Sequence, residues 1–410
     1  MRLFLLLIFI YPFFLFSQQA GEFKFDLTKQ CLTDTERQFI FKEIEENIQL
    51  LNIDLKSDHR KNSLDFDWPL QKDTSLAFNN YFGISNYVDQ DTAINSILDY
   101  NCLSRSYDGH KGTDIFTWPF PWYIYDNGYV NVIASEDGVI INKHDGYDDD
   151  HCVNTMGGTW NAVYVQHYDG SIAWYGHLEK NTLTSKQIGQ SVVKGEYLGK
   201  VASSGYSTGP HLHFEIYDSM WNLIDPFQGT CNILNQNSWW LNQRAYRVPT
   251  LNALLTHSAK PVHGCPGINE EPNISSSFNI GDTIFLAAYF SDRQSGDSAV
   301  YRVFDANNNL WQTWNQVTST TFNASWYYWK RLLPQNGPFG YWRFEIEFQN
   351  QIFSHEFLYT NPLFIEDKQN SRRDLILITD ILGRKSPIDR NKLLFYIYND
   401  GSVEKRLIYK

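Results

Sequence analysis

The sequence predicts a mainly β protein with one helix near its N-terminus. Aromatic residues make up 16% of the 410 residues, and flat aromatic side chains are favoured on pleated strands. From Asp108 to Gly229, short apolar segments alternate with turn residues, which is typical of an antiparallel β core. From Ile280 to Phe364, alternating or apolar runs recur at the spacing of a small Ig-like β-sandwich.

The helix is expected between Leu27 and Leu55. Apolar residues recur there at helical spacing, and Thr33 or Asp34 is suited to cap the N-terminus. This helix is expected to pack on the part of the chain that follows it. Residues 57–100 are expected to consist mostly of loops.

Within the β core, the run from Asn161 to His177 predicts the clearest hairpin. Asp169-Gly170 at its centre favours a tight type I′ turn. Another pair of strands is expected on either side of Asp137-Gly138.

The charge balance and the N-terminal segment limit where the protein acts. The formal net charge of −12 argues against nucleic acid, whose phosphates require a basic surface. Arg2, an apolar run from Leu3 to Phe16 and the small Ser17 have the pattern of a signal peptide over residues 1–18. This run is too short to span a bilayer comfortably, and no second long apolar segment follows. We therefore expect a secreted or cell-surface protein whose mature chain has no transmembrane anchor.

The five cysteines form no Cys-x-x-Cys pair, so a cysteine zinc site is not expected. Disulfides are allowed in an exported protein. Cys102 with Cys152 is the preferred pair, Cys231 with Cys265 is possible, and one cysteine must remain unpaired.

The stretch from Gly209 to Glu215 carries two histidines two positions apart. On a strand, His211 and His213 would face one side, a cleft, while Leu212 and Phe214 would face the core. Imidazole is a common zinc ligand and also a general base near neutral pH. The alternative is a half-buried strand that carries two histidines by chance.

Three further candidate groups precede this stretch. His110 and Asp114 lie in a loop with Gly109 and Gly112, whose freedom lets the backbone direct both side chains toward one point. His177 follows the end of the predicted hairpin.

Three motifs in this order resemble the lysostaphin-type zinc endopeptidases, which cleave peptide cross-bridges in bacterial cell walls. The resemblance covers roughly residues 105–227 and implies a peptidase sheet of the duplicated-hybrid-motif type. The motifs are His-x-x-x-Asp at 110–114, Tyr-Gly-His-Leu at 175–178 and His-Leu-His-Phe-Glu at 211–215.

Carried over residue by residue, the resemblance implies one Zn²⁺ per chain, bound by His110, Asp114 and His213. It implies that His177 and His211 are catalytic. Three protein ligands leave a fourth zinc position open for water, as catalytic sites require. Which histidine handles which proton is left open by the sequence.

The C-terminal stretch resembles the type A sorting domain of the Bacteroidetes type IX secretion system. That resemblance implies the secretion machinery as a partner. The alternative is an ordinary terminal β-module that completes the sandwich. The residues that carry the resemblance are Leu382-Gly383-Arg384, Leu394 to Tyr398, Asp400-Gly401 and Glu404-Lys405-Arg406.

The expected function is that of a secreted zinc metalloendopeptidase, a hydrolase acting on peptidoglycan cross-bridges or stem peptides. The alternatives are a metalloprotease acting on glycine-rich or other extracellular polypeptides and a non-catalytic surface-binding protein. The long acidic stretch from Lys143 to Gly158 departs from the family pattern and is expected to shape one wall of the cleft. Residues 19–100 are a candidate latency element, although no residue there is marked as one that would fill the fourth zinc position.

The expected organisation therefore follows the chain in six parts. They are a signal peptide at 1–18, an N-terminal helical and loop region at 19–100, the zinc endopeptidase domain at 101–235, a connector at 236–265, a β-sandwich at 266–366 and a sorting module at 370–410.

Overall fold

The structure is a computed structural model in which the chain divides into two compact units, Met1–Thr360 and Asn361–Lys410. The expected signal sequence falls almost wholly outside the described residues. Within the described part of the chain, no helix has both the length and the apolar character needed to cross a membrane. The described residues are 18–24, 30–52, 65–153, 158–265, 270–361, 375–387, 392–399 and 403–407.

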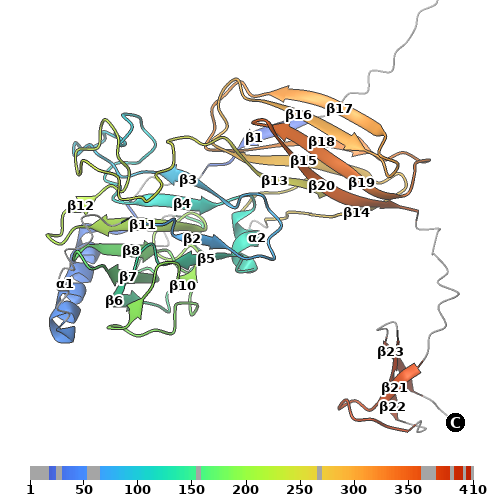
Figure 1. The fold of residues 1–410 in the computed structure, drawn as a ribbon, viewed down its shortest axis with the longest axis horizontal. Helices are drawn as coiled ribbons and strands as arrows, with labels where there is room; N and C mark the ends of the chain where they lie inside the picture. The colour runs from blue at the N-terminus through green and yellow to red at the C-terminus, as the bar shows by residue number, and fades with distance from the viewer. Residues whose placement is uncertain are drawn as a thin grey trace, which may run out of the picture. The chain divides into compact units, whose positions relative to one another are not determined.

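The largest sheet of the first unit has the order β3-β4-β11-β8-β7-β6-β9, with β12 paired to β11 (Figure 1). Every neighbouring pair in it is antiparallel, as the sequence predicts. Strand β11 lies between β4 and β8, so the histidine strand occupies an interior position. The strands are β3 (Phe82–Asn86), β4 (Thr113–Thr117), β6 (Gly138–His144), β7 (Ala162–Gln166), β8 (Ile172–Gly176), β9 (Ser191–Val192), β11 (His211–Tyr217) and β12 (Leu223–Ile224).

A smaller sheet, β10-β5-β2, shares the hydrophobic core of the large sheet. It consists of β2 (Leu70–Lys72), β5 (Val130–Ile133) and β10 (Tyr197–Lys200). The residues around Asp137 therefore connect two sheets and do not form a hairpin, because β5 lies in the small sheet and β6 in the large one. Leu212 and Phe214 are fully buried in the shared core, as their alternation with the histidines predicts.

The predicted hairpin is confirmed as β7 and β8, but its turn is not of type I′. A type I′ turn requires positive φ at both central residues, and only Gly170 has one, at +85°. The amide of His167 donates to the carbonyl of Ser171 at 2.8 Å, and the amide of Gly170 donates to the carbonyl of His167 at 3.0 Å. The loop is therefore longer than Asp169-Gly170 alone would make it.

Helix α1 (Asp34–Leu51) confirms the predicted N-terminal helix. Thr33 is its N-cap: the amide of Glu36 donates to the Thr33 hydroxyl, and the Glu36 carboxylate accepts from the amide of Thr33 at 2.8 Å. This reciprocal capping box satisfies two amides that the helix itself leaves unpaired. Ile40 and Ile44 are buried against strands of the large sheet. The second helix is α2 (Pro121–Asp126).

The region expected to be mostly loops contributes to both sheets. Within residues 65–100, β2 pairs with β5, and β3 pairs with β4. Neither strand is long, and β2 has only three residues, so the segment lacks the alternation that marks a strand in sequence.

Two further sheets of the first unit enclose a second core, as in a β-sandwich. One has the order β1-β18-β15-β13 and the other β14-β20-β19-β16-β17. The first sheet reaches into the stretch expected as a connector and also includes the N-terminal strand β1. The strands are β1 (Gln18–Glu22), β13 (Thr250–His257), β14 (Ser277–Asn279), β15 (Thr283–Ser291), β16 (Ser298–Phe304), β17 (Leu310–Val317), β18 (Ala324–Leu332), β19 (Gly340–Phe348) and β20 (Gln351–Thr360).

The second unit contains a three-stranded antiparallel sheet, β21-β22-β23. Its strands are β21 (Leu375–Thr379), β22 (Leu393–Tyr398) and β23 (Val403–Leu407). Leu394, Tyr396 and Tyr398 form a small core of its own.

The disulfide joins Cys102 to Cys231, so the preferred pairing of Cys102 with Cys152 is wrong. The amide of Cys231 donates to the carbonyl of Tyr100, which brings the two distant segments together. The possible pairing of Cys231 with Cys265 is excluded by the same bond. The prediction was based on the nearness of Cys102 and Cys152 to the proposed site in sequence. The fold instead joins Cys102 to a residue 129 positions away.

Candidate active site

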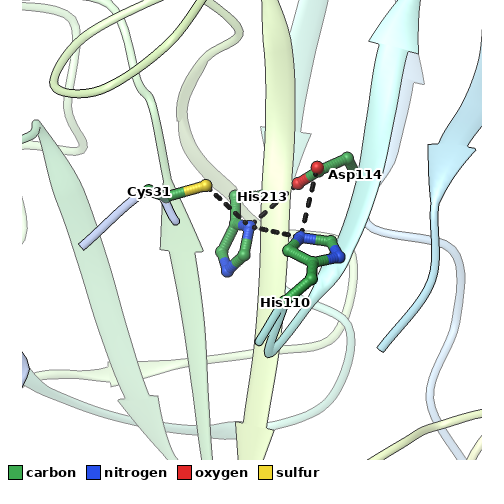
Figure 2. A group of neighbouring side chains, drawn as sticks. All are labelled: Cys31, His110, Asp114 and His213. Carbon is green, nitrogen blue, oxygen red and sulfur yellow. Dashed lines mark hydrogen bonds and ion pairs between the residues drawn. The ribbon is translucent and has the colours of Figure 1, made fainter. Parts of the chain in front are cut away.

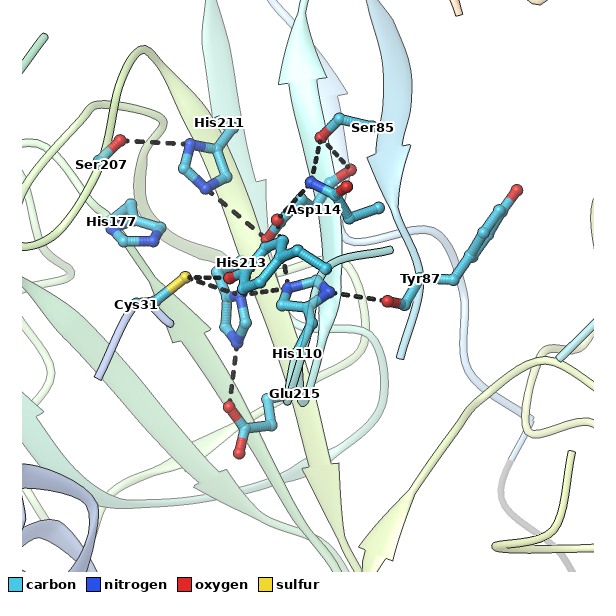
Figure 3. A network of polar contacts seen from close by, with 12 residues as sticks. Cys31, Ser85, Tyr87, His110, Asp114, His177, Ser207, His211, His213 and Glu215 are labelled. Atoms are coloured by element: carbon cyan, nitrogen blue, oxygen red, sulfur yellow. Dashed lines mark hydrogen bonds and ion pairs between the residues drawn. The ribbon is translucent and has the colours of Figure 1, made fainter. Parts of the chain in front are cut away.

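The large sheet brings all five predicted groups to one place (Figure 3). His211 and His213 lie on β11, and the register sets His213 opposite Asp114 on one side and Gly176 on the other. His177 directly follows Gly176 at the end of β8, and His110 lies in the loop before β4. Pairing of β4, β11 and β8 therefore assembles residues that are far apart in sequence.

Three of these groups have the spacing of metal ligands (Figure 2). Nε2 of His110 lies 3.1 Å from Oδ2 of Asp114, and Nδ1 of His213 lies 2.8 Å from Oδ1. The two imidazole nitrogens are 3.3 Å apart. With bonds of about 2.0–2.1 Å, ligand atoms around a tetrahedral zinc ion are separated by about 3.3 Å. Two imidazoles and a carboxylate at these separations fit zinc.

Hydrogen bonds outside this trio orient its rings. Nδ1 of His110 donates to the carbonyl of Tyr87 at 2.7 Å, and Nε2 of His213 donates to the carboxylate of Glu215 at 3.0 Å. These bonds direct Nε2 of His110 and Nδ1 of His213 toward Asp114. Such outer partners fix the tautomer and ring position of metal-binding histidines.

Asp114 is held by its own set of contacts. The side-chain amide of Asn86 donates to Oδ2 at 3.0 Å. Burial raises the pKa of Asp114, but His110 and His213 outweigh it, and the pKa lies well below its usual value. The carboxylate is thus kept in the ionised form that binds a metal.

Glu215 connects the site to helix α1. Its second carboxylate oxygen accepts from Arg37 and from the hydroxyl of Tyr217. Burial raises the pKa of Glu215, but Arg37 and His213 outweigh it and lower that pKa. Sequence reasoning assigned no role to Arg37, although it precedes Ile40 by three residues and so lies on the apolar face of the helix.

Gly112 is required by a close approach. A Cβ at this position would lie 2.6 Å from the His213 ring and 2.9 Å from the carbonyl oxygen of Phe214. Gly109 serves the same loop differently, because its φ of +74° is a backbone conformation that favours glycine. The two glycines predicted to shape the loop therefore do so for separate reasons.

His177 and His211 stand side by side next to the trio, with ring centroids 4.3 Å apart. Nδ1 of His177 donates to the carbonyl of Ser204 at 2.5 Å, and Nδ1 of His211 donates to the carbonyl of Gly209 at 2.8 Å. Each ring therefore directs Nε2 into the site. Burial and the neighbouring His211 lower the pKa of His177. Burial also lowers the pKa of His211, but the neighbouring Cys31 thiol and the Asp114 carboxylate outweigh this effect and raise it.

The acidic insert borders this pair. Asp149 accepts from the amide of Lys180 at 2.6 Å, so the insert is bonded to the segment after β8. Nδ1 of His151 donates to the carbonyl of Gly205 at 2.6 Å. Because Ser204 accepts the hydrogen bond from His177, the insert contacts the loop that orients one of the two imidazoles.

Cys31 is the residue that sequence reasoning missed. Its sulfur lies 3.5 Å from Nδ1 of His213 (Figure 2). It also lies 3.1 Å from the hydroxyl of Tyr107. Burial raises the pKa of this thiol, but His213 and His177 outweigh it and hold the pKa well below its usual value. The sequence signal was the odd number of cysteines, which leaves one thiol for a role other than a disulfide.

The comparisons with known proteins concern the same part of the chain. Residues 109–226 match the model of Peptidase family M23. DD-carboxypeptidase/endopeptidase Mpg of Neisseria gonorrhoeae is 40% identical over 84 residues, which are 20% of this chain and 16% of the relative. Peptidoglycan DD-endopeptidase ShyC of Vibrio cholerae is 28% identical over 148 residues, 32% of this chain and 29% of the relative. The chain thus spans less than a third of these curated relatives.

Solved structures are also similar to parts of the chain. The catalytic domain of the antimicrobial peptidase lysostaphin from Staphylococcus simulans is 25% identical, covers 36% of this chain and 90% of its own, and has a TM-score of 0.23. A zinc-containing peptidase from Vibrio cholerae is 20% identical, covers 40% of this chain and 39% of its own, and has a TM-score of 0.25. TM-scores this low carry no argument about the present fold.

The motif residues thus lie in the part of the chain that is similar to a metallopeptidase domain. Residues 109–226 match the model of Peptidase family M23, which supports the resemblance to lysostaphin-type enzymes for this part of the chain. The segment with three ligand-type side chains and two further imidazoles lies wholly inside the matched residues.

Proposed function

We propose that the protein is a secreted zinc metalloendopeptidase that hydrolyses peptide bonds in peptidoglycan. The observation that carries this proposal is the arrangement on three neighbouring strands, β4, β11 and β8. Three ligand-type side chains converge there beside two imidazoles that are not needed as ligands. The family match supports the reaction class, and the names of the relatives Mpg and ShyC support peptidoglycan as the substrate.

Nε2 of His110, a carboxylate oxygen of Asp114 and Nδ1 of His213 would hold the metal. When bound there, zinc would supply water activation near neutral pH and polarisation of the scissile carbonyl. The chain's own contribution is to keep Asp114 ionised and both rings aimed inward. In the present conformation His110, Asp114 and His213 are at most 2% exposed.

His177 and His211 would move the protons. Each imidazole has Nδ1 occupied by a backbone carbonyl, so Nε2 is the atom that accepts or releases a proton. One ring takes a proton from the attacking water, and the other protonates the leaving amine or stabilises the developing oxyanion. Their ring centroids lie 4.3 Å apart, so both rings can lie close to the same peptide bond.

Export is part of the proposal and rests on the sequence. The apolar run from Leu3 to Phe16 supports a signal peptide, and residues 370–410 support a partner in the type IX secretion machinery. The three strands of the second unit, β21 to β23, are compatible with a small terminal module.

The test is digestion of purified peptidoglycan by the zinc-loaded protein, with product muropeptides identified by mass spectrometry. The unchanged chain and a Cys31→Ala variant are assayed together, because Cys31 lies among the ligand atoms. A glycine-rich protein serves as the competing substrate, and His110→Ala in either background is the matched control. We expect new peptide ends in the peptidoglycan and none with His110→Ala.

Two results would contradict the proposal. Complete digestion by the His110→Ala variant would show that the reaction does not need a zinc ion bound by His110. Cleavage of the glycine-rich protein alone would replace peptidoglycan by extracellular polypeptides as the substrate.

A further inference from the structure

The candidate metal centre contains four potential ligand atoms where a catalytic zinc site needs three. The sulfur of Cys31 lies together with a ligand atom from each of His110, Asp114 and His213, all within 4.8 Å of one another (Figure 2). Structural zinc sites are closed by four protein ligands, whereas catalytic sites keep the fourth position for water or substrate. With Cys31 in place, the group has the composition of a closed site.

We propose that Cys31 is a fourth metal ligand and that residues 30–52 are an inhibitory segment, which must leave the site before a substrate can bind. This inference rests on the proposed function, because it assumes a metal bound by His110, Asp114 and His213. It adds a ligand that lies outside the matched family domain and a latent state of the enzyme.

The position of the sulfur supports inhibition as well as metal binding. Cys31 also belongs to a second group with His177 and His211, again within 4.8 Å. The thiol therefore lies between the metal-binding trio and the two proton-transferring imidazoles. This is the space that a scissile peptide bond would have to occupy.

An independent observation indicates a missing ligand at the same place. Nε2 of His177 is buried and has no hydrogen-bond partner among the described residues. A buried polar nitrogen without a partner is costly, and in a functional site it indicates an absent ion, water or substrate group. This nitrogen belongs to the ring that faces Cys31 and His211.

Burial of the whole site agrees with a latent form. His177 and His211 are 0% exposed, and Cys31 itself is 2% exposed. A peptide substrate must reach both the metal and the imidazoles. In this conformation Cys31 of the N-terminal segment lies among those groups.

The segment is anchored specifically on both sides of the site. The capping box at Thr33 fixes the backbone two residues after Cys31, and Arg37 forms a buried ion pair with Glu215. Farther along the helix, the Glu43 carboxylate accepts from Nε2 of His144 at 2.7 Å. On the other side of Cys31, β1 pairs with β18 of the sandwich. These contacts hold the thiol at the metal site.

The deciding experiment replaces zinc with Co²⁺ in the full chain and records the near-ultraviolet absorption. A bound thiolate gives an intense sulfur-to-cobalt charge-transfer band, which imidazole and carboxylate ligands do not give. We expect the band in the unchanged chain and in a Cys265→Ala control, and its loss in Cys31→Ala with cobalt still bound. Stoichiometric cobalt binding by the unchanged chain without this band would overturn the inference.

Chemical labelling of the thiol provides a measurement that needs no variant. Iodoacetamide modification of Cys31 is followed by peptide mass mapping. The reaction should be at least about tenfold slower in the zinc-loaded chain than after zinc is removed by a chelator. A thiol that is accessible in only about 1–10% of the molecules reacts in proportion to that fraction. Equal labelling rates would show that no metal protects the thiol and would overturn the inference.

Turnover tests the inhibitory part. Cys31→Ala should cleave peptidoglycan about tenfold faster or more than the unchanged chain, whereas Cys265→Ala should not change the rate. Equal turnover of the unchanged chain and Cys31→Ala would overturn the latent state. If neither cleaves peptidoglycan and the cobalt band still depends on Cys31, the ligand assignment holds and the proposed function fails. Absence of any cobalt binding would contradict both.

Discussion

Arg37, on helix α1, forms a buried ion pair with Glu215, and Glu215 accepts a hydrogen bond from His213 at 3.0 Å. A residue of the N-terminal segment thereby contributes to the position of the His213 ring, a proposed metal ligand. The side chains of Arg37 and Glu215 are 6% and 0% exposed, so water replaces neither partner.

Replacement of Arg37 by alanine should destabilise the protein strongly. The change leaves the Glu215 carboxylate buried without its charge partner, and breaking a buried pair in this way costs about 3–5 kcal/mol. Urea denaturation followed by tryptophan fluorescence measures the loss. Lys42→Ala is the matched control, because its ion pair with Glu46 on the same helix is largely exposed and contributes about 0.5 kcal/mol or less. Similar small losses for both variants would contradict the structural importance of Arg37.

Zinc content should separate ligands from proton-transferring residues. We expect His110→Ala and His213→Ala to lose zinc, with a fall in affinity larger than the roughly 10–100-fold cost of losing an outer hydrogen-bond partner. His177→Ala and His211→Ala should retain about one zinc per chain and lose turnover, because the Nε2 atoms of these histidines are proposed to accept and release protons and not to bind the metal. Elemental analysis after gel filtration measures the metal. Loss of zinc from His177→Ala would reassign that ring as a ligand.

Gly112→Ala should weaken metal binding without removing a ligand. Its new Cβ would lie 2.6 Å from the His213 ring, so the ring must move. Overpacking of this kind costs about 1–3 kcal/mol of stability. Zinc titration calorimetry and thermal unfolding give the two readouts. Gly199→Ala is the control, because its Cβ would meet only Leu178 and Leu183 atoms, the nearest at 3.2 Å. Unchanged zinc affinity in Gly112→Ala would show that the loop relaxes freely.

Glu270 should make stability depend on pH near neutrality. Burial raises the pKa of Glu270 to about 8, while its amide partner Tyr123 donates at 2.8 Å. Because the folded-state pKa lies above the unfolded value of about 4.3, the stabilising contribution is complete below that value. It falls as pH rises and is lost above about pH 8.

Glu270→Gln removes this titration while keeping an oxygen for the Tyr123 amide. The melting temperature of the unchanged chain, relative to Glu270→Gln, should therefore decrease from pH 5 to pH 8. If the difference in melting temperature between the two proteins stays constant from pH 5 to pH 8, Glu270 does not titrate in this way.

The sequence was sufficient for the parts of the site that depend on local pattern. Alternation along one strand separates His211 and His213 from Leu212 and Phe214, and the structure buries the latter two in the core. The N-cap at Thr33 was equally local, since its partner Glu36 is three residues away. Such features are predictable because the backbone geometry of one element fixes which side chains are neighbours.

The parts that escaped prediction depend on contacts between distant segments. Cys31 meets His213 across 182 positions, and Cys102 meets Cys231 across 129. The periodicity of a sequence does not show which distant loops the fold brings together. The predicted pairing of Cys102 with Cys152 was therefore wrong. The residues around Asp137 were misread for the same reason, because β5 and β6 pair with partners in different sheets.

Strand β11 pairs with β4 on one side and with β8 on the other, and this backbone pairing fixes the relative positions of the site residues on these strands. A slip of one residue would turn His211 and His213 toward the core and Leu212 and Phe214 toward the reacting groups. The positions of His211 and His213 relative to Asp114 are therefore set by main-chain hydrogen bonds and are insensitive to small side-chain changes elsewhere. Insertions in the loops that connect these strands leave the register of the sheet unchanged.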